Sequence, residues 1–235
     1  MIQFHDTLLK DAWFASLPAT TQQALLNRAR LRHLDEGEAL FYRGDPFAGL
    51  YCLIGGSIRI CCATEDGQAA ILAFVDTSQW FGEVGLFDRK SRSHDAVADR
   101  QTKVLHVPAQ DIDLLLAQEP ALWKHLGALA VQKMRNLFVG LEAYALKSGS
   151  VWVARRLLMI ARQSETLPLE QGPRPQANIV PVSQDQLSQM LAKTRQTTNR
   201  MLRKLETEGV IRCGYRHIEI LDWDALWQAA ELHQH

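Results

Sequence analysis

Long side chains that donate hydrogen bonds are concentrated in the stretch SQDQLSQMLAKTRQTTNRMLRKLETEGVI, residues 183–211. Arg195, Gln196, Asn199 and Arg200 lie within about one helical turn of each other, and no carboxylate lies among them. Such side chains distinguish base edges in the major groove, because Arg can form two hydrogen bonds with O6 and N7 of guanine. Asn or Gln can form two hydrogen bonds with N6 and N7 of adenine. The stretch therefore has the chemistry needed to read double-stranded DNA.

The pattern around these residues predicts two short helices joined by a tight turn. Ser183 and Gln186 have the spacing of a capping box, and Thr194 has the residue type of an N-cap for the second helix. Mostly apolar residues at helical spacing give the helices an inner face; they are Leu187, Met190, Leu191, Thr198, Met201, Leu202 and Leu205. The segment EGVIRCGYRHIEILD then continues as strand, turn and strand. We expect a winged helix-turn-helix.

The local charge supports DNA binding. Seven basic and three acidic residues lie between Ser183 and Arg216, and we expect the acids to lie away from the reading end. The expected DNA contacts are Ser183, Arg195, Gln196, Thr197, Asn199, Arg200 and Arg203. Arg212 or Arg216 in the wing is expected to add a phosphate contact. The alternative, a solvated basic helix in a bundle, does not account for the cap, the turn, the inner stripe and the outer donors together.

A second set of residues could hold an anion. The stretch WFGEVGLFDRKSRS contains Gly82, Glu83, Arg92 and Ser93. Glycine lets backbone N–H groups approach an anion, Arg supplies a cationic fork, Ser adds a hydroxyl, and a carboxylate accepts from a sugar hydroxyl. These four residues predict an effector site for a sugar phosphate. The alternative is a purely structural ion pair between Glu83 and Arg92.

The remaining sequence indicates two domains that position these two sets. The length of 235 residues favours two domains over one. Residues 1 to about 30 have a helical pattern, whereas short β-branched and aromatic runs between residues 31 and 107 predict an antiparallel β-barrel or roll. We expect an α+β protein in which residues 1–119 form a sensory β-roll domain with N-terminal helices. Residues 151–235 are expected to form the winged helix-turn-helix DNA-binding domain.

A long helix is predicted between the two domains, at residues 120–146, and residues 147–150 (KSGS) are expected to form a hinge. Alternating steps of three and four give this helix the seam of a two-stranded coiled coil. The seam residues are Gly127, Ala130, Met134, Leu137, Leu141 and Tyr144. Other apolar residues are expected to pack within the chain; they are Leu122, Leu126, Leu129, Val131 and Phe138. We expect the seam to pair two copies of the chain, and the alternative is that it packs on the chain's own β domain.

The composition narrows the class of protein. With 26 acidic and 26 basic residues the chain is not a polycation that coats nucleic acid, so any basic surface is local. No apolar run is long enough to span a membrane, and the start of the chain is acidic where a signal peptide would be basic, which predicts a cytoplasmic protein with no membrane partner. Acid/base pairs such as His94 with Asp95 have no activated nucleophile or metal shell nearby, so we do not expect an enzyme.

The four cysteines show no metal-ligand spacing; they are Cys52, Cys61, Cys62 and Cys213. We therefore expect no metal site and interpret the cysteines as small core residues. A redox role for the first three stays open.

The order of these elements resembles a known family. A β-roll with GLYCLIGGSIRI, DGQ, FGEVGLF and RS, then a long helix, a hinge and a winged helix, is similar over nearly the whole chain to the cyclic-AMP receptor protein/fumarate-nitrate regulator (Crp/Fnr) superfamily of bacterial transcription factors. The resemblance implies a sequence-specific transcription regulator that forms a homodimer and binds an inverted-repeat operator. It also implies an effector sensed in the β-roll and RNA polymerase as a partner.

The resemblance implies roles for residues of the second helix. Arg195, Gln196 and Asn199 match the base-reading positions, with Gln196 in place of the glutamate of the best-known member. Arg200 and Ser183 match phosphate-contacting positions. The operator sequence, and whether transcription is raised or lowered, do not follow from the resemblance.

In the β-roll, Glu83 matches the carboxylate that holds the ribose of a cyclic nucleotide, and Arg92 with Ser93 matches its phosphate contacts. The chain departs from this pattern at His94 and Asp95, which bring bulk and negative charge where binding members usually have a small residue. The effector is therefore a cyclic nucleotide bound in another way, a different ligand, or none, since effector-free members exist.

Leu137 and Phe138 correspond to the polar pair that contacts adenine in the cyclic-AMP receptor, and neither can hydrogen-bond a base. We therefore expect the protein to respond to something other than cyclic AMP by the familiar route, or to bind cyclic AMP weakly. The N-terminal cysteine cluster of the iron–sulfur members is absent from the sequence, so that cluster is not expected. Two alternatives stay open: a haem or redox sensor using His33, His94 or His106, and a degenerate regulatory module whose winged helix contacts only proteins.

Overall fold

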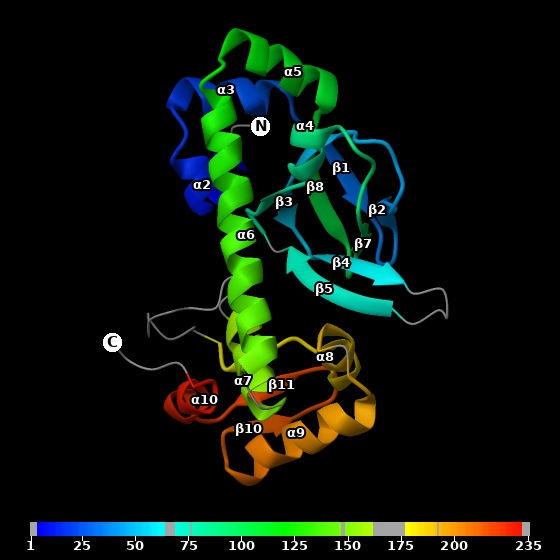
Figure 1. Ribbon diagram of the computed structural model, residues 1–235, viewed down its shortest axis with the longest axis vertical. Coiled ribbons are helices and arrows are strands. Elements are labelled where there is room, and N and C mark those ends of the chain that lie inside the picture. The colour runs from blue at the N-terminus through cyan, green and yellow to red at the C-terminus, as the bar shows by residue number, and fades with distance from the viewer. Residues whose placement is uncertain are drawn as a thin grey trace. The chain divides into compact units, whose positions relative to one another are not determined.

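The computed structural model describes residues 4–63, 69–75, 77–146, 149–161, 177–191 and 193–231, and gives only the backbone of residues 63, 69, 139, 140 and 142–146. The chain divides into two compact units, Met1–Gln68 with Leu72–Lys133 and Ala69–Ile71 with Met134–His235 (Figure 1). The first unit carries the predicted effector residues, and the second carries the whole stretch 183–211.

The first unit begins with three short helices, α1 (His5–Leu8), α2 (Ala12–Ala15) and α3 (Ala19–Arg28). The helical pattern at the start of the chain thus corresponds to several elements. Asp11 caps α2 by accepting a hydrogen bond from the backbone N–H of Phe14 (2.8 Å). Pro18 sits at the N-cap of α3, where its missing N–H costs nothing.

Two four-stranded sheets follow, as the β-rich texture predicts. One has the order β1-β8-β3-β6, from Arg30–Leu34, Thr102–Pro108, Gly49–Gly55 and Trp80–Phe81. The other has the order β2-β7-β4-β5, from Ala39–Phe41, Asp95–Ala98, Ile58–Ala63 and Ala69–Val75. Neighbours in the first sheet, and β2, β7 and β4 in the second, pair antiparallel, which confirms the predicted β-roll (Figure 1).

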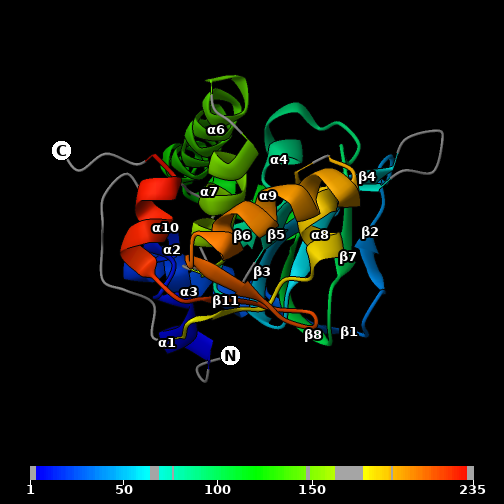
Figure 2. The same cartoon turned by 90° about the horizontal axis from the view of Figure 1, so that it is seen from below.

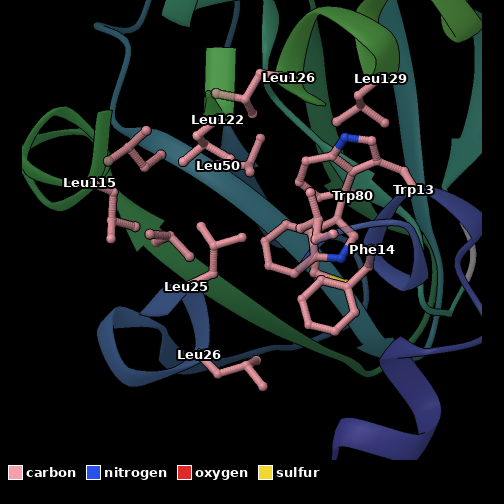
Figure 3. Packing of buried hydrophobic residues seen from close by; sticks show 14 of the residues in the cluster. Trp13, Phe14, Leu25, Leu26, Leu50, Trp80, Leu115, Leu122, Leu126 and Leu129 are labelled. Atoms are coloured by element: carbon pink, nitrogen blue, oxygen red, sulfur yellow. The ribbon is translucent and has the colours of Figure 1, made fainter. Parts of the chain in front are cut away.

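An aromatic cluster anchors the helices to the first sheet (Figure 3). Trp80 of β6 is 1% exposed and stacks on Phe14 of α2, with ring centroids 5.5 Å apart. Trp13 meets Trp80 edge-on at 5.5 Å and donates its indole N–H to the backbone carbonyl of His125 (2.6 Å). These contacts fix the start of the long helix α6 (Leu122–Leu146) against the β-roll.

Helix α6 extends over 25 residues and confirms the long helix predicted at residues 120–146. Leu122, Leu126 and Leu129 are buried in the first unit's core, as predicted. Val131 and Phe138 were also expected to pack within the chain, and that expectation is wrong, because both side chains are exposed. Both lie on the side of α6 opposite the row of Leu122, Leu126 and Leu129, and so cannot reach the same core.

The hinge predicted at residues 147–150 lies partly outside the described residues, which resume at Gly149, the first residue of α7 (Gly149–Ala161). Two short helices connect the strands of the β-roll to one another and to α6; they are α4 (Val84–Asp88) and α5 (Ala109–Gln118). The domain bounds at residues 119, 146 and 150 stay predictions.

The second unit is a winged helix-turn-helix (Figure 2). After α7 and β9 (Ile179–Val180) come α8 (Gln184–Met190) and α9 (Arg195–Thr207). The hairpin of β10 (Ile211–Cys213) and β11 (Ile218–Ile220) forms the wing, the three strands pair in the order β10-β11-β9, and α10 (Trp223–Ala229) closes the unit. Both units combine helices with antiparallel sheets, so the α+β prediction is confirmed.

One apolar core holds this unit together. Leu187 of α8 packs with Leu202 and Leu205 of α9, and all three are at most 1% exposed. Leu157 of α7 and Trp227 of α10 belong to the same cluster. The period of 3.6 residues therefore dictates which residues of α9 face outward.

Candidate functional site

The beginnings of α8 and α9 are fixed by side-chain caps. The hydroxyl of Ser183 accepts from the backbone N–H of Gln186 (3.1 Å), and the Gln186 amide oxygen accepts from the backbone N–H of Ser183 (2.9 Å). The hydroxyl of Thr194 accepts from the backbone N–H of Thr197 (3.2 Å) and donates to the Thr197 hydroxyl (3.0 Å). Both predicted N-caps are confirmed, and Thr197, which was expected to contact DNA, is part of the second cap.

The polar face of α9 is the one the sequence predicts. Arg195, Gln196, Arg200 and Arg203 are exposed, and Asn199 is half-buried. The opposite face contains the buried residues Thr198, Leu202 and Leu205. Five of the predicted DNA contacts, Arg195, Gln196, Asn199, Arg200 and Arg203, thus lie together on a helix whose N-terminus is exposed. Their roles on DNA stay predictions.

An acidic residue lies at the reading end, contrary to the sequence-based expectation. Asp185, in the first turn of α8, accepts from both Nε and Nη2 of Arg195 in a two-pronged ion pair. The expectation holds at the other end of α9, where Glu206 accepts from the backbone N–H of Cys213 (2.9 Å). Spacing along one helix could not reveal Asp185, because it comes from the preceding helix.

The two wing arginines differ in their surroundings. Arg212 pairs across the hairpin with Glu219, Nη1 to Oε2 at 3.1 Å, as their register requires. Arg216 is exposed in the turn between β10 and β11, at a positive φ of 59°. Of the two, Arg216 has the position suited to a phosphate contact.

In the β-roll, Arg92 points into the protein. Its Nη1 donates to the carbonyl of Gly82 (3.0 Å) and its Nη2 to the carbonyl of Gly49 (2.8 Å). Three aromatic rings surround the guanidinium within 4.3–5.4 Å of their centroids; they belong to Phe41, Phe47 and Tyr51. Burial lowers the pKa of Arg92, while the hydroxyl of Tyr51 and the charges of Glu83 and Asp45 oppose that shift.

Gly82 is required next to this guanidinium. Its φ of +91° lies in the left-handed region, and a Cβ there would come within 3.1 Å of Nη1 of Arg92. The Nε of Arg92 is buried and has no hydrogen-bond partner within the described part of the chain. Arg92 thus has one donor group that a bound molecule could satisfy.

Glu83 is paired with Lys133 of α6. The carboxylate is 3% exposed, and its Oε2 lies 3.0 Å from Nζ of Lys133. Lys133 also donates to the carbonyl of Trp80 (2.8 Å). Among described residues, the structure gives Glu83 this partner in place of the alternative ion pair with Arg92. Helical spacing places Lys133 in the same row as Leu126 and Leu129, but it does not show which acid Lys133 meets.

Ser93 lies outside this arrangement. It is exposed, and its hydroxyl lies 2.9 Å from Nδ1 of His94. The carboxylate of Asp95 accepts from the backbone N–H of Arg43 (2.7 Å) and so belongs to a loop contact. The structure therefore brings Gly82 and Arg92 into contact beside the buried Glu83, and leaves Ser93 at the surface.

The described residues contain no group of three or more His, Cys, Asp or Glu side chains able to hold a metal ion. His106 stacks on Tyr51 (4.6 Å) and its Nε2 lies 3.0 Å from the carbonyl of Ala48; burial lowers its pKa. The four cysteines are free, and burial raises the pKa of Cys52 well above its ordinary value.

No helix in the described ranges is both long and apolar enough to cross a membrane.

The predicted seam on α6 is largely exposed. Gly127 and Ala130 are half-buried, and the side chain of Tyr144 lies outside the described residues. Met134, Leu137 and Leu141 are 49%, 69% and 62% exposed. Together with the exposed Val131 and Phe138 they form what we call the apolar band, defined as Val131, Met134, Leu137, Phe138 and Leu141. A monomer rarely leaves so many large apolar residues of one helix in water.

Two known domain families match the chain. The cyclic nucleotide-binding domain matches residues 31–119, and the Crp-like helix-turn-helix domain matches residues 153–229. The first range contains Glu83 and Arg92, and the second contains α8, α9 and the wing. Both predicted sites thus fall within matched ranges.

Several known proteins are similar over most of the chain. The cyclic AMP receptor protein of Thermus thermophilus is 29% identical over 185 residues, 79% of this chain and 81% of the relative. A CRP-like cAMP-activated global transcriptional regulator of Mycobacterium tuberculosis is 22% identical over 225 residues, 96% of this chain and 99% of the relative. A solved CRP/FNR-family transcriptional regulator from Thermus thermophilus has a TM-score of 0.70 at 25% identity, covering 86% of this chain and 98% of that one.

Removal of the ammonium that faces Glu83 tests the buried ion pair. Lys133→Ala should lower the free energy of unfolding of the first unit by roughly 3 kcal/mol, the lower end for buried pairs, because Lys133 is partly exposed. The double variant Glu83→Gln/Lys133→Met should recover most of that loss. Urea unfolding of the full chain gives the values, with the exposed Lys124→Ala as control. A loss in Lys133→Ala no larger than in the control would show that the pair does not hold this region.

Proposed function

Because the chain belongs to the Crp/Fnr superfamily of transcription regulators, we propose that it binds specific DNA sequences as a cytoplasmic homodimer. It has a cyclic nucleotide-binding domain followed by a Crp-like helix-turn-helix DNA-binding domain. The superfamily is a class of transcription regulators and not a class of enzymes. The comparisons favour neither a haem sensor nor a module restricted to protein contacts.

The observation that carries the proposal is the polar face of α9. Arg195, Gln196 and Asn199 stand on the first turns of a helix whose other face is buried, so the helix can enter a major groove with these donors toward the bases. Arg200, Arg203 and the cap residue Ser183 flank them toward the phosphates. The free N–H groups at the start of α9 also favour a phosphate.

The apolar band supports the homodimer. Pairing of two bands covers side chains that one copy leaves in water, and the steps of three and four suit two parallel helices. A symmetric dimer presents two copies of α9, which reach successive major grooves when they lie about 34 Å apart. The operator is then an inverted repeat of double-stranded DNA. RNA polymerase is the further partner of a regulator of this class.

The β-roll is the proposed sensing domain. Several relatives are described as cAMP-activated, but the residues here do not fit cyclic AMP bound in the usual way. Glu83 is held by Lys133, Arg92 donates to two backbone carbonyls, and the positions expected at adenine are Leu137 and Phe138. We propose that the β-roll either answers to another anionic effector or stabilises the regulator without one.

Selection from random DNA duplexes tests the function as a whole. The full chain should enrich an inverted repeat with half-sites one helical turn apart, and its affinity should fall steeply as salt rises. Failure to enrich any sequence, with no salt-dependent binding, would contradict DNA recognition and favour a module for protein contacts.

Two arginines of α9 should behave differently on the selected operator. Arg195→Ala should cost about 1–3 kcal/mol and relax base choice at one position of each half-site, because a forked base contact is lost. Arg200→Ala should weaken all sequences alike and lower the salt slope by about 1 per half-site. Fluorescence anisotropy over a salt series gives both values, with Gln228→Ala, exposed on α10, as control. If Arg195→Ala kept the base preference of the wild type, Arg195 would not be a base-recognition residue.

Charges placed in the apolar band should separate the dimer. Leu137→Glu combined with Leu141→Glu should give monomers in sedimentation equilibrium, because both side chains are more than half exposed in one copy and charges buried at the seam would repel each other. Gln132→Glu, on the same helix outside the band, should leave a dimer. A band variant that sediments like the control would show that the dimer, if there is one, pairs elsewhere.

Cyclic AMP should leave the protein unaffected. A ligand present at 100 times its Kd adds about 2.7 kcal/mol to the free energy of unfolding, so a melting curve detects binding without any activity measurement. We expect no shift in melting temperature and no change in operator affinity with cyclic AMP. A clear shift together with tighter operator binding would contradict the interpretation of Glu83, Leu137 and Phe138.

A further inference from the structure

We propose that Asp185 is a positioning residue for base recognition: its carboxylate holds one edge of the Arg195 guanidinium and directs the other edge at a guanine. This inference rests on the proposed function. The two side chains come from the successive helices α8 and α9, and their carboxylate and guanidinium meet through Nε and Nη2. Asp185 is the one acidic residue near the reading end among the acids between Ser183 and Arg216.

The donor groups of Arg195 suffice for both contacts at once. A guanidinium has five N–H bonds in a rigid plane. Asp185 uses the Nε–H and one hydrogen of Nη2, which leaves the second hydrogen of Nη2 and both hydrogens of Nη1. The remaining Nη1/Nη2 edge is itself a fork that fits O6 and N7 of guanine. In the described residues Nη1 has no hydrogen-bond partner, and the Arg195 side chain is 75% exposed.

The carboxylate is held firmly enough to act as a guide. Asp185 lies in the first turn of α8, just after the capping box of Ser183 and Gln186, and its backbone carbonyl accepts from the hydroxyl of Ser188 (2.7 Å). The packing of Leu187 against the core fixes α8 relative to α9. The direction of the Arg195 fork is therefore set by tertiary structure, which removes rotamer freedom that an unguided Arg would lose only on binding DNA.

A carboxylate at this place also has an unfavourable effect. DNA carries a dense negative charge, so Asp185 repels every duplex alike, whatever its sequence. Its proposed benefit is confined to the sequence that offers a guanine to Arg195. The two effects differ in direction: removal of the charge should raise affinity for non-specific DNA and lower discrimination among specific sites. If the carboxylate only competed with DNA for Arg195, its removal would raise all affinities equally.

The test compares Asp185→Asn with wild type on three duplexes at one salt concentration. These are the selected operator, the operator substituted at the base pair whose recognition depends on Arg195, and an unrelated duplex. We expect the affinity ratio of the first two duplexes to fall by about tenfold, a typical loss for a weakened forked base contact, while the unrelated duplex binds at least as tightly as before. Glu208→Gln is the matched control, since it removes the same charge at the far end of α9. It should leave the ratio unchanged.

A double variant separates an effect that acts through Arg195 from a general effect of Asp185→Asn on folding. In the Arg195→Ala background, Asp185→Asn should leave the ratio unchanged, because there is no fork to direct. An unchanged ratio in Asp185→Asn alone, with all three affinities raised alike, would overturn the inference and leave the proposed function intact. If wild type selects no operator, the proposed function itself fails, and the two failures are thereby distinguished.

Discussion

Burial of Leu202 and Leu205 in the core of the C-terminal unit decides the direction of every other side chain on α9. An α-helix turns 100° per residue, so once these two positions face inward, Gln196 and Arg200 face outward. Arg195, seven residues before Leu202, is exposed because it is the first residue of the helix. The caps at Ser183 and Thr194 fix where the two helices begin, and hence which residues occupy the exposed first turns. Recognition of DNA thus depends on an apolar contact that never touches the DNA.

The features that could be predicted from the sequence are those that depend on residues close together in the chain. Caps, turn residues and helical spacing located α8, α9 and the wing, and alternating β-branched runs located the β-roll, because each of these signals acts between residues a few positions apart. The two opposite faces of α9 also follow from spacing alone. The long helix was found for the same reason, since no proline interrupts the pattern between residues 120 and 146.

Partners from distant elements were not predictable in this way. Glu83 meets Lys133, fifty positions away, and Arg195 meets Asp185 of the preceding helix. A charged side chain takes whichever opposite charge the tertiary fold brings within reach, and spacing does not encode that choice. Val131 and Phe138 were assigned to the inside of the chain for their apolar character, although a period of 3.6 residues puts both opposite the buried row of Leu126 and Leu129. In both units apolar packing fixes the positions of the helices and strands, and the ion pairs form between side chains that this packing brings together.

Methylation protection of guanines on the selected operator tests the central claim most directly, because dimethyl sulfate attacks guanine N7 in the major groove, where α9 is expected to lie. The account predicts two protected clusters, symmetric about the centre of the operator and about one helical turn apart, with Arg195→Ala restoring reactivity at one guanine in each cluster. Bound protein that leaves every guanine N7 reactive would contradict it.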